Sequence, residues 1–80
     1  MVTIKLFGSM RLKTGCKGLE VPAGDAPSVK AACQLLAGET GHNIKEFKNC
    51  VFMINGKPAT FTSPLKDNDE LVLLAAAGGG

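Results

Sequence analysis

One segment of this chain has the spacing of an amphipathic helix, and it limits the possible folds more than any other feature. Four apolar residues recur at the i, i+3, i+4 and i+7 positions of one helix face: Val29, Ala32, Cys33 and Leu36. Ser28 precedes them as an N-cap, because its hydroxyl can accept a hydrogen bond from an unpaired backbone N–H. Gly38 is expected to end the helix. A single helix with one apolar face requires a sheet to cover that face.

The segments before and after this helix differ in how clearly they predict structure. Residues 2–7 alternate as a half-buried strand does, with three apolar side chains on one face: Val2, Ile4 and Leu6. Residues 8–18 are polar and interrupted by glycine, which predicts a broad connection. Residues 19–21 alternate again and predict a short second strand. Residues 39–49 allow two interpretations, a turn of helix or a loop that lies on the core.

The C-terminal half predicts three more strands. Residues 51–54 form the first, and the Asn-Gly pair at 55–56 indicates a hairpin because both residues tolerate positive φ. Pro58 cannot donate to a strand ladder, so residues 59–61 are expected to form a short edge strand. Residues 70–74 form the last strand. Its consecutive apolar residues are typical of a central strand covered on both faces, or of a strand with one face that meets a partner.

The predicted order is strand, strand, helix, strand, short strand, strand. The first and last strands are the most apolar, so we expect them to lie side by side and parallel at the centre of the sheet. This is an α+β arrangement, with a mixed sheet of four to five strands packed on one main helix. It is typical of the β-grasp fold, the architecture of ubiquitin. We place the domain at residues 1–74 and a flexible, glycine-terminated tail at residues 75–80.

Composition argues against several classes of protein. Eighty residues allow one small domain, and 45% hydrophobic with 20% charged residues disfavours disorder. A net charge of +2, spread along the chain, does not indicate nucleic-acid binding. No apolar stretch reaches membrane-spanning length, so we expect a cytoplasmic protein away from membranes. Three cysteines and one histidine, spaced as here, favour reduced thiols without a metal or a directly bound cofactor.

The chain ends on three alanines and three glycines, directly after the apolar residues 71–74. Glycine offers no side chain for binding, but it gives a thin backbone and a carboxylate with no neighbouring Cβ. Such a tail can thread through a narrow channel into another protein's active site. An acyl group activated on glycine also cannot epimerise. The alternative interpretation is a frayed end, because disorder concentrates at termini.

Three segments carry a family likeness: the loop at residues 7–15, the hairpin at residues 54–57 and the segment at residues 64–71. They resemble the MoaD proteins, the small subunit of molybdopterin synthase, and a terminal double glycine follows at the expected distance. The resemblance runs over essentially the whole chain. ThiS, the thiamine sulfur carrier, shares the fold and the double glycine, but it is usually shorter and lacks a loop like residues 10–12.

The resemblance implies a sulfur carrier that is not catalytic alone. In the family, an adenylating enzyme of the MoeB or ThiF type condenses the terminal glycine carboxylate with ATP, and a sulfur donor converts the adenylate to a thiocarboxylate. The thiocarboxylate delivers sulfur to a pterin precursor on the large, MoaE-like synthase subunit, for a molybdenum or tungsten cofactor. Alternatives are a carrier for thiamine or another thiolation pathway, a ubiquitin-like modifier that forms isopeptide bonds, and an accessory domain with an idle tail.

The same resemblance assigns the chemistry to the terminal glycines. Gly80 is the residue whose carboxylate would be activated and would carry the sulfur. The family usually ends on two glycines and this chain ends on three, so a protease could also trim the last residue and leave Gly79 as the working end. Gly78 is expected to act as a spacer that contacts the partner.

The candidate partner contacts lie on the sheet and in the first loop. Phe7 points away from the predicted helix. With Phe61 and one set of side chains from the last strand, Leu73 among them, it would form an exposed apolar patch of the kind that marks interfaces. The alternative is that long loops fold over it. Arg11 would pair with acidic groups on a partner, or be solvated. We expect a free monomer that docks through its sheet face and inserts its tail.

Overall fold

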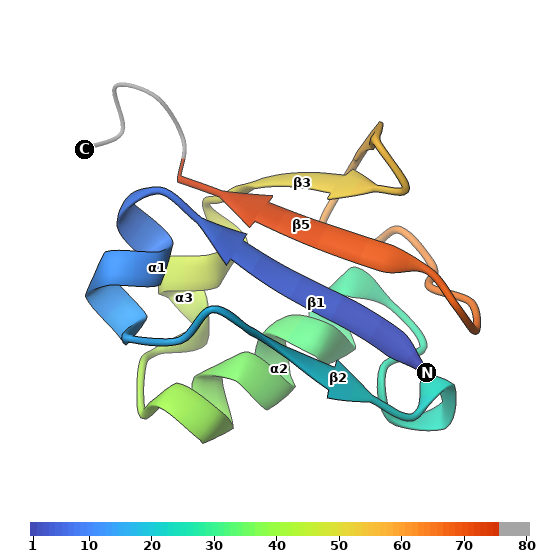
Figure 1. The fold of residues 1–80 in the computed structure, drawn as a ribbon, viewed down its shortest axis with the longest axis horizontal. Helices are drawn as coiled ribbons and strands as arrows, with labels where there is room; N and C mark the ends of the chain where they lie inside the picture. Colours follow the sequence, from blue (N-terminus) through green and yellow to red (C-terminus); the bar gives the residue numbers. More distant parts are fainter. Residues whose placement is uncertain (76–80) are drawn as a thin grey trace.

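Five strands form one mixed sheet in the computed structural model, which describes residues 1–75 (Figure 1). The strands lie in the order β2-β1-β5-β3-β4. Their bounds are Val2–Phe7 for β1, Gly18–Val21 for β2, Val51–Ile54 for β3, Lys57–Ala59 for β4 and Glu70–Leu74 for β5. The predicted tail at residues 75–80 lies outside the described residues, except for Ala75. Within the described part, no helix combines the length and the apolar character needed to cross a bilayer.

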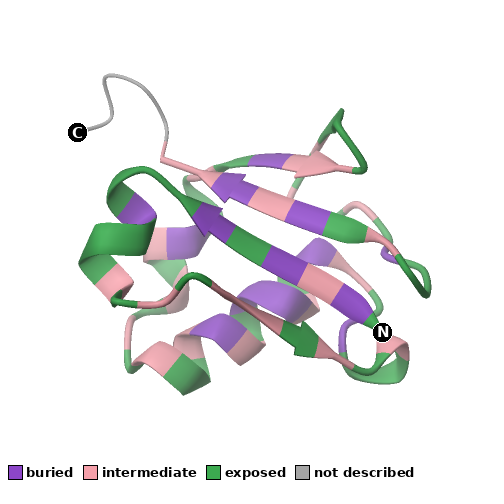
Figure 2. Cartoon of the chain, viewed as in Figure 1, coloured by how far each residue is buried: buried purple, intermediate pink, exposed green. Residues whose placement is uncertain are grey.

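The centre of the sheet is the parallel pair β1 and β5. Leu6 lies opposite Leu73, and Leu73 in turn lies opposite Phe52 of β3. The β1–β2, β3–β4 and β3–β5 pairs are antiparallel. The predicted placement of the first and last strands is therefore confirmed, as is the mixed sheet. Burial alternates along β1 and β5, as the banding of these strands in Figure 2 shows.

The main helix, α2 at Val29–Thr40, packs on one face of the sheet (Figure 1). Its predicted N-cap is confirmed, because the Ser28 hydroxyl accepts a hydrogen bond from the Ala31 N–H at 3.2 Å. Its predicted end at Gly38 is wrong. The helix continues to Thr40 and ends at Gly41, which adopts the left-handed conformation at φ 72°. A glycine inside a helix weakens the helix without ending it. The helix ends at Gly41 because the backbone there adopts a positive φ.

Two short helices occupy segments that the sequence left open or assigned to a loop. Helix α3, Ile44–Lys48, settles the interpretation of residues 39–49 as helix. Asn43 caps it, accepting from the Lys45 N–H at 3.0 Å, while Glu46 accepts from the Asn43 N–H at 3.1 Å. The predicted broad connection at residues 8–18 is only partly correct, because it contains helix α1, Ser9–Thr14. A single 3-10 turn, η1, covers Ala23–Asp25.

The last hairpin differs from the prediction at its returning strand. We expected an edge strand at residues 59–61, but β4 begins at Lys57, directly after the turn, and ends at Ala59. Pro58 lies inside it, opposite Met53. Proline is tolerated here because β4 is an edge strand, which pairs on one side only. The backbone nitrogen of Pro58, which has no hydrogen to donate, can therefore face solvent. The turn itself is as predicted, with positive φ at Asn55 and Gly56.

The hydrophobic core lies between the sheet and helices α2 and α3. Among residues 1–75, fourteen are buried in it: Val2, Ile4, Leu6, Met10, Ala26, Val29, Ala32, Cys33, Leu36, Phe47, Phe52, Leu65, Leu71 and Leu73. The four residues predicted for the buried face of the helix are all among them, so the helical periodicity identified the correct face. Leu71 and Leu73 enter this core from one side of β5, which places Val72 and Leu74 on the other.

The two glycines at the end of α2 generate a stability prediction. We expect Gly38→Ala to stabilise the protein by about 0.5–1 kcal/mol, because alanine loses less entropy in a helix and the added methyl group meets open space. We expect Gly41→Ala to destabilise it by about 1 kcal/mol, because its φ of 72° disfavours an L-residue. Urea unfolding of both variants measures the difference. A loss of stability in Gly38→Ala would contradict a helix that runs through this position.

Candidate functional site

The face of the sheet opposite the helices carries an apolar row at the end where β5 stops. The row crosses three strands, with Phe7 of β1 opposite Leu74 of β5 and Leu74 opposite Val51 of β3. Partners in register point to the same face, so the three side chains are neighbours. Phe7 is 41% exposed and Val51 is 47% exposed, whereas Leu74 is half-buried between them.

A second row continues this surface toward the middle of the sheet. Lys5, Val72 and Met53 lie opposite one another across the same three strands. Val72 and Met53 are half-buried, and the Lys5 ammonium pairs with the Glu70 carboxylate at 3.2 Å. We call the five apolar residues of the two rows the end-of-sheet patch: Phe7, Val51, Met53, Val72 and Leu74. Their exposure and continuity are typical of a docking surface.

Two of the predicted partner contacts lie elsewhere. Leu73 is fully buried, so its prediction as a partner contact is wrong; alternation along β5 puts Leu74 on the open face instead. Phe61 is half-buried against the edge of the core, with its ring centroid 6.1 Å from that of buried Phe52. The Lys48 ammonium lies 5.7 Å from the same ring centroid. Phe61 is therefore not grouped with Phe7, although its contact with a partner stays a prediction.

Helix α1 borders the patch at the end of the sheet. It follows β1 directly and contacts both β1 and β5 (Figure 1). Met10 anchors it in the core, while Arg11 and Leu12 are exposed. Leu12 is 86% exposed, the largest exposed fraction of any large hydrophobic side chain in residues 1–75. Arg11 is exposed on this helix, and its contact with a partner stays a prediction.

The chain leaves the sheet at this same place. Strand β5 ends at Leu74, and Ala75 is half-buried against the core. The residues that the resemblance assigns to chemistry, Gly78, Gly79 and Gly80, lie outside the described residues. Within residues 1–75, no three metal-ligating side chains come together.

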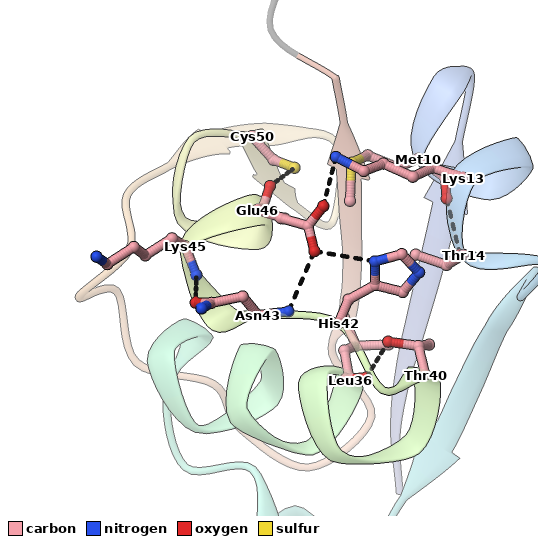
Figure 3. Close-up of polar contacts among 10 residues, drawn as sticks. All are labelled: Met10, Lys13, Thr14, Leu36, Thr40, His42, Asn43, Lys45, Glu46 and Cys50. Carbon is pink, nitrogen blue, oxygen red and sulfur yellow. Dashed lines mark hydrogen bonds and ion pairs between the residues drawn. The ribbon is translucent and has the colours of Figure 1, made fainter.

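A polar cluster centred on Glu46 links α1 to α3 (Figure 3). One carboxylate oxygen pairs with the Lys13 ammonium at 2.5 Å, and the other lies 2.9 Å from His42 Nδ1 and 3.1 Å from the Asn43 nitrogen. The Lys13 ammonium, followed by His42, lowers the pKa of Glu46 from 4.5 to about 2, because both favour the charged carboxylate.

Two of the thiols are set up for packing rather than for chemistry. Cys33 is fully buried on α2, and burial raises the pKa of its thiol to about 12. Burial also raises the pKa of Cys50, whose Sγ donates to the Glu46 carbonyl oxygen at 3.6 Å. A reactive cysteine needs a thiolate near neutral pH. Neither of these two is available as one.

The sequence correctly placed Phe7 on the open face of the sheet but did not identify the other four residues of the patch. Val51 and Met53 alternate with Phe52 and Ile54, which is the signal that separates the two faces of β3. That segment contains four apolar residues in succession, so hydrophobicity alone hides the alternation. The exposure of Leu12 was not predicted because residues 8–18 were expected to form a loop. In a loop, side chains do not alternate or repeat in a regular pattern that would show which of them face solvent.

Comparison with known proteins identifies relatives of this fold. A family model described as the ThiS family matches residues 4–80. No curated protein matches this chain in sequence.

Solved structures give three full-length likenesses at low identity. The small archaeal modifier SAMP1 from Haloferax volcanii is 21% identical at a TM-score of 0.75, with 99% of this chain and 98% of that chain covered. A putative molybdopterin converting factor subunit 1 from Pyrococcus furiosus is 20% identical at a TM-score of 0.69, covering 95% and 97%. A chain of the Helicobacter pylori complex of subunits 1 and 2 of molybdopterin-converting factor is 21% identical at 0.62, covering 99% and 97%. These likenesses confirm the β-grasp fold.

The Glu46 cluster generates a prediction for acid stability. The folded-state pKa is about 2, below the ordinary value of 4.5, so this group stabilises the fold above pH 4.5 and the contribution is lost as pH falls toward 2. We expect Glu46→Gln to show a smaller loss of stability than the wild type over this window, measured by urea unfolding midpoints. The loss of stability that remains in Glu46→Gln comes partly from Asp67 and Asp69. The N-terminal amine lowers the pKa of Asp67, and the Lys66 N–H lowers the pKa of Asp69. An unchanged pH dependence in Glu46→Gln would contradict the assignment.

Proposed function

This chain belongs to the ThiS family, and from that premise we propose that it is a sulfur carrier that holds sulfur as a C-terminal thiocarboxylate. The observation that carries the proposal is the extent of the family match, residues 4–80, which includes the three terminal glycines. The fold supports it, because β5 leads the chain to the end of the sheet, beside an apolar surface. A carrier needs both a docking surface and a slender reactive end.

The proposed chemistry belongs largely to partner enzymes. An adenylating enzyme of the MoeB or ThiF type would join the glycine carboxylate to the α-phosphate of ATP and release pyrophosphate. A sulfur donor would then displace AMP and leave a thiocarboxylate on Gly80, or on Gly79 after trimming. The carrier itself contributes an unhindered carboxylate with no neighbouring Cβ. It binds no cofactor directly.

We place this chain in the synthesis of a molybdopterin-type cofactor, for molybdenum or tungsten. The support is the MoaD-like sequence of residues 64–71, together with the full-length likeness to the P. furiosus subunit 1. The proposed acceptor is a pterin precursor on a large, MoaE-like subunit. The H. pylori structure is a complex of subunits 1 and 2 of molybdopterin-converting factor, which supports a two-subunit assembly here. The free carrier is proposed to be a cytoplasmic monomer.

The end-of-sheet patch is the proposed docking surface for both partners. The patch lies at the end of β5, where the tail begins, so a protein that covers the patch is also positioned to receive the tail. Transient interfaces of this kind need only a modest buried area. The half-exposed Phe7 and Val51 flank Leu74 and are the most exposed apolar residues of the patch, and the ion pair of Lys5 with Glu70 gives it a polar border.

Intact-mass analysis tests the proposed chemistry. Incubation with the adenylating enzyme of the source organism, ATP and a sulfide donor is expected to raise the mass by the difference between sulfur and oxygen. Deletion of Gly79 and Gly80 together should abolish the change, whereas deletion of Gly80 alone preserves it if Gly79 is the working end. Higher-mass conjugates on denaturing gels would instead favour a protein modifier. Complementation of a thiamine defect, but not of a pterin defect, would favour the thiamine route.

Substitutions in the patch test the docking surface. We expect Phe7→Ala to raise the KM for the carrier in ATP–pyrophosphate exchange about tenfold, by removing a large, exposed apolar contact. The matched control is Thr3→Ala, on the same strand face but opposite Glu70 at the far end of β5. Leu73→Ala should instead lower the free energy of unfolding by about 2–5 kcal/mol, because Leu73 is buried. Equal KM values for Phe7→Ala and Thr3→Ala would exclude docking through the patch.

A further inference from the structure

Helix α1 is joined to the rest of the fold through two glycines with positive φ. Gly8 precedes it at φ 64° and Gly15 ends it at φ 68°. Six residues form an intrinsically weak helix, because nucleation costs more than one turn of hydrogen bonds returns. The position of α1 therefore depends on the contacts that its side chains make with neighbouring elements.

Two side chains supply those contacts from the inner side of α1. Met10 is 5% exposed and anchors the helix in the core. Lys13 reaches across to the Glu46 carboxylate of α3, at 2.5 Å. Glu46 is itself held by the Asn43 N–H and by His42, so the lysine meets a fixed acceptor rather than a mobile one (Figure 3). Met10 packs α1 against the core, and the ion pair with Glu46 is a second contact between α1 and the rest of the fold.

The outer side of α1 presents an unusual pair of residues. Leu12 is 86% exposed, and exposed Arg11 precedes it. The helix has no acidic residue, so Arg11 places a positive charge next to an exposed apolar side chain. A complementary partner surface would carry carboxylates around a shallow apolar pocket.

The length of the tail restricts which protein can cover this surface. On the proposed function, the reacting carboxylate belongs to Gly79 or Gly80, four or five residues beyond Ala75. Five residues span at most about 18 Å. Strand β5, which leads to Ala75, contacts α1. A protein that encloses the carboxylate in its active site must therefore approach the end of the sheet that α1 borders.

We propose that Glu46 is a positioning residue: through Lys13 it holds α1 so that Leu12 and Arg11 dock into the acidic, apolar-centred surface of the protein that activates the tail. This inference rests on the proposed function, since it names the partner of the same reactive end. It adds α1 to the end-of-sheet patch as a second contact region. It also gives the Glu46 cluster a role that extends from α3 to the docking surface.

Hydrogen exchange tests the positioning step without any partner. The Gly15 N–H donates to the Arg11 carbonyl oxygen at 3.0 Å. Its exchange rate therefore reports how often this hydrogen bond at the end of α1 opens. We expect Lys13→Met to raise its exchange rate about threefold, in keeping with a partly exposed ion pair, whereas Lys13→Arg retains the charge and the wild-type rate. Lys30→Met, which removes an exposed lysine on α2, is the control. Equal rates in Lys13→Met and Lys30→Met would overturn the positioning role.

Steady-state ATP–pyrophosphate exchange tests docking. We expect Leu12→Ala to raise the KM for the carrier about fivefold and Lys13→Met about threefold, both with kcat unchanged, since only docking is altered. The unfolding midpoint of Leu12→Ala should equal that of the wild type because the side chain is exposed. A purely structural ion pair would lower the unfolding midpoint of Lys13→Met and leave its KM unchanged, which would overturn the proposal.

The two proposals fail in different ways. If the wild-type protein supports no pyrophosphate exchange, the proposed function fails, and hydrogen exchange still decides whether Glu46 positions α1. If the wild type is active and the KM of Leu12→Ala equals that of the wild type, the carrier function stands and docking through α1 is excluded. Gln34→Ala, an exposed change on α2, serves as the matched control for Leu12→Ala.

Discussion

The parallel pairing of β1 with β5 is the constraint on which the rest of the structure depends. It joins the first and last strands at the centre of the sheet and brings Phe7 and Leu74 together at the same end of the sheet. Register across three strands then sorts every side chain to one of two faces, because side chains alternate along each strand. The core forms on the helix side. The end-of-sheet patch forms on the other side, at the point where the chain leaves β5.

The same pairing explains why the candidate site is assembled from distant parts of the sequence. The end of β1, the start of β3 and the end of β5 contribute to one surface, and α1 borders it because that helix follows β1 directly. On the proposed function, a reactive tail would begin beside an apolar surface and next to α1. Docking and sulfur delivery would then both take place at one end of the sheet, and the remaining elements would maintain the geometry of that end.

Much of this architecture could be predicted because local periodicity and turn chemistry agree with the tertiary fold. The helix face at Val29–Leu36, the Ser28 cap and the turn at Asn55 and Gly56 were all interpretable from residue type and spacing. The predicted helix end at Gly38 was wrong because a glycine can lie inside a helix. Residue type alone does not show which glycine adopts the positive φ that ends the helix, as Gly41 does. The apolar run of β5 did not reveal that Leu73 faces inward and Leu74 outward, since both residues are leucine.

The sequence by itself determined the class of fold, the central position of the two most apolar strands, and the family likeness that points to the terminal glycines. These follow from hydrophobic pattern and motif, which act over short distances along the chain. The tertiary structure decided which apolar residues remain exposed, that residues 9–14 form a helix, and that Lys13 meets Glu46. The physical reason is that exposure and ion pairing depend on what packs against a side chain, and those neighbours come from elsewhere in the chain.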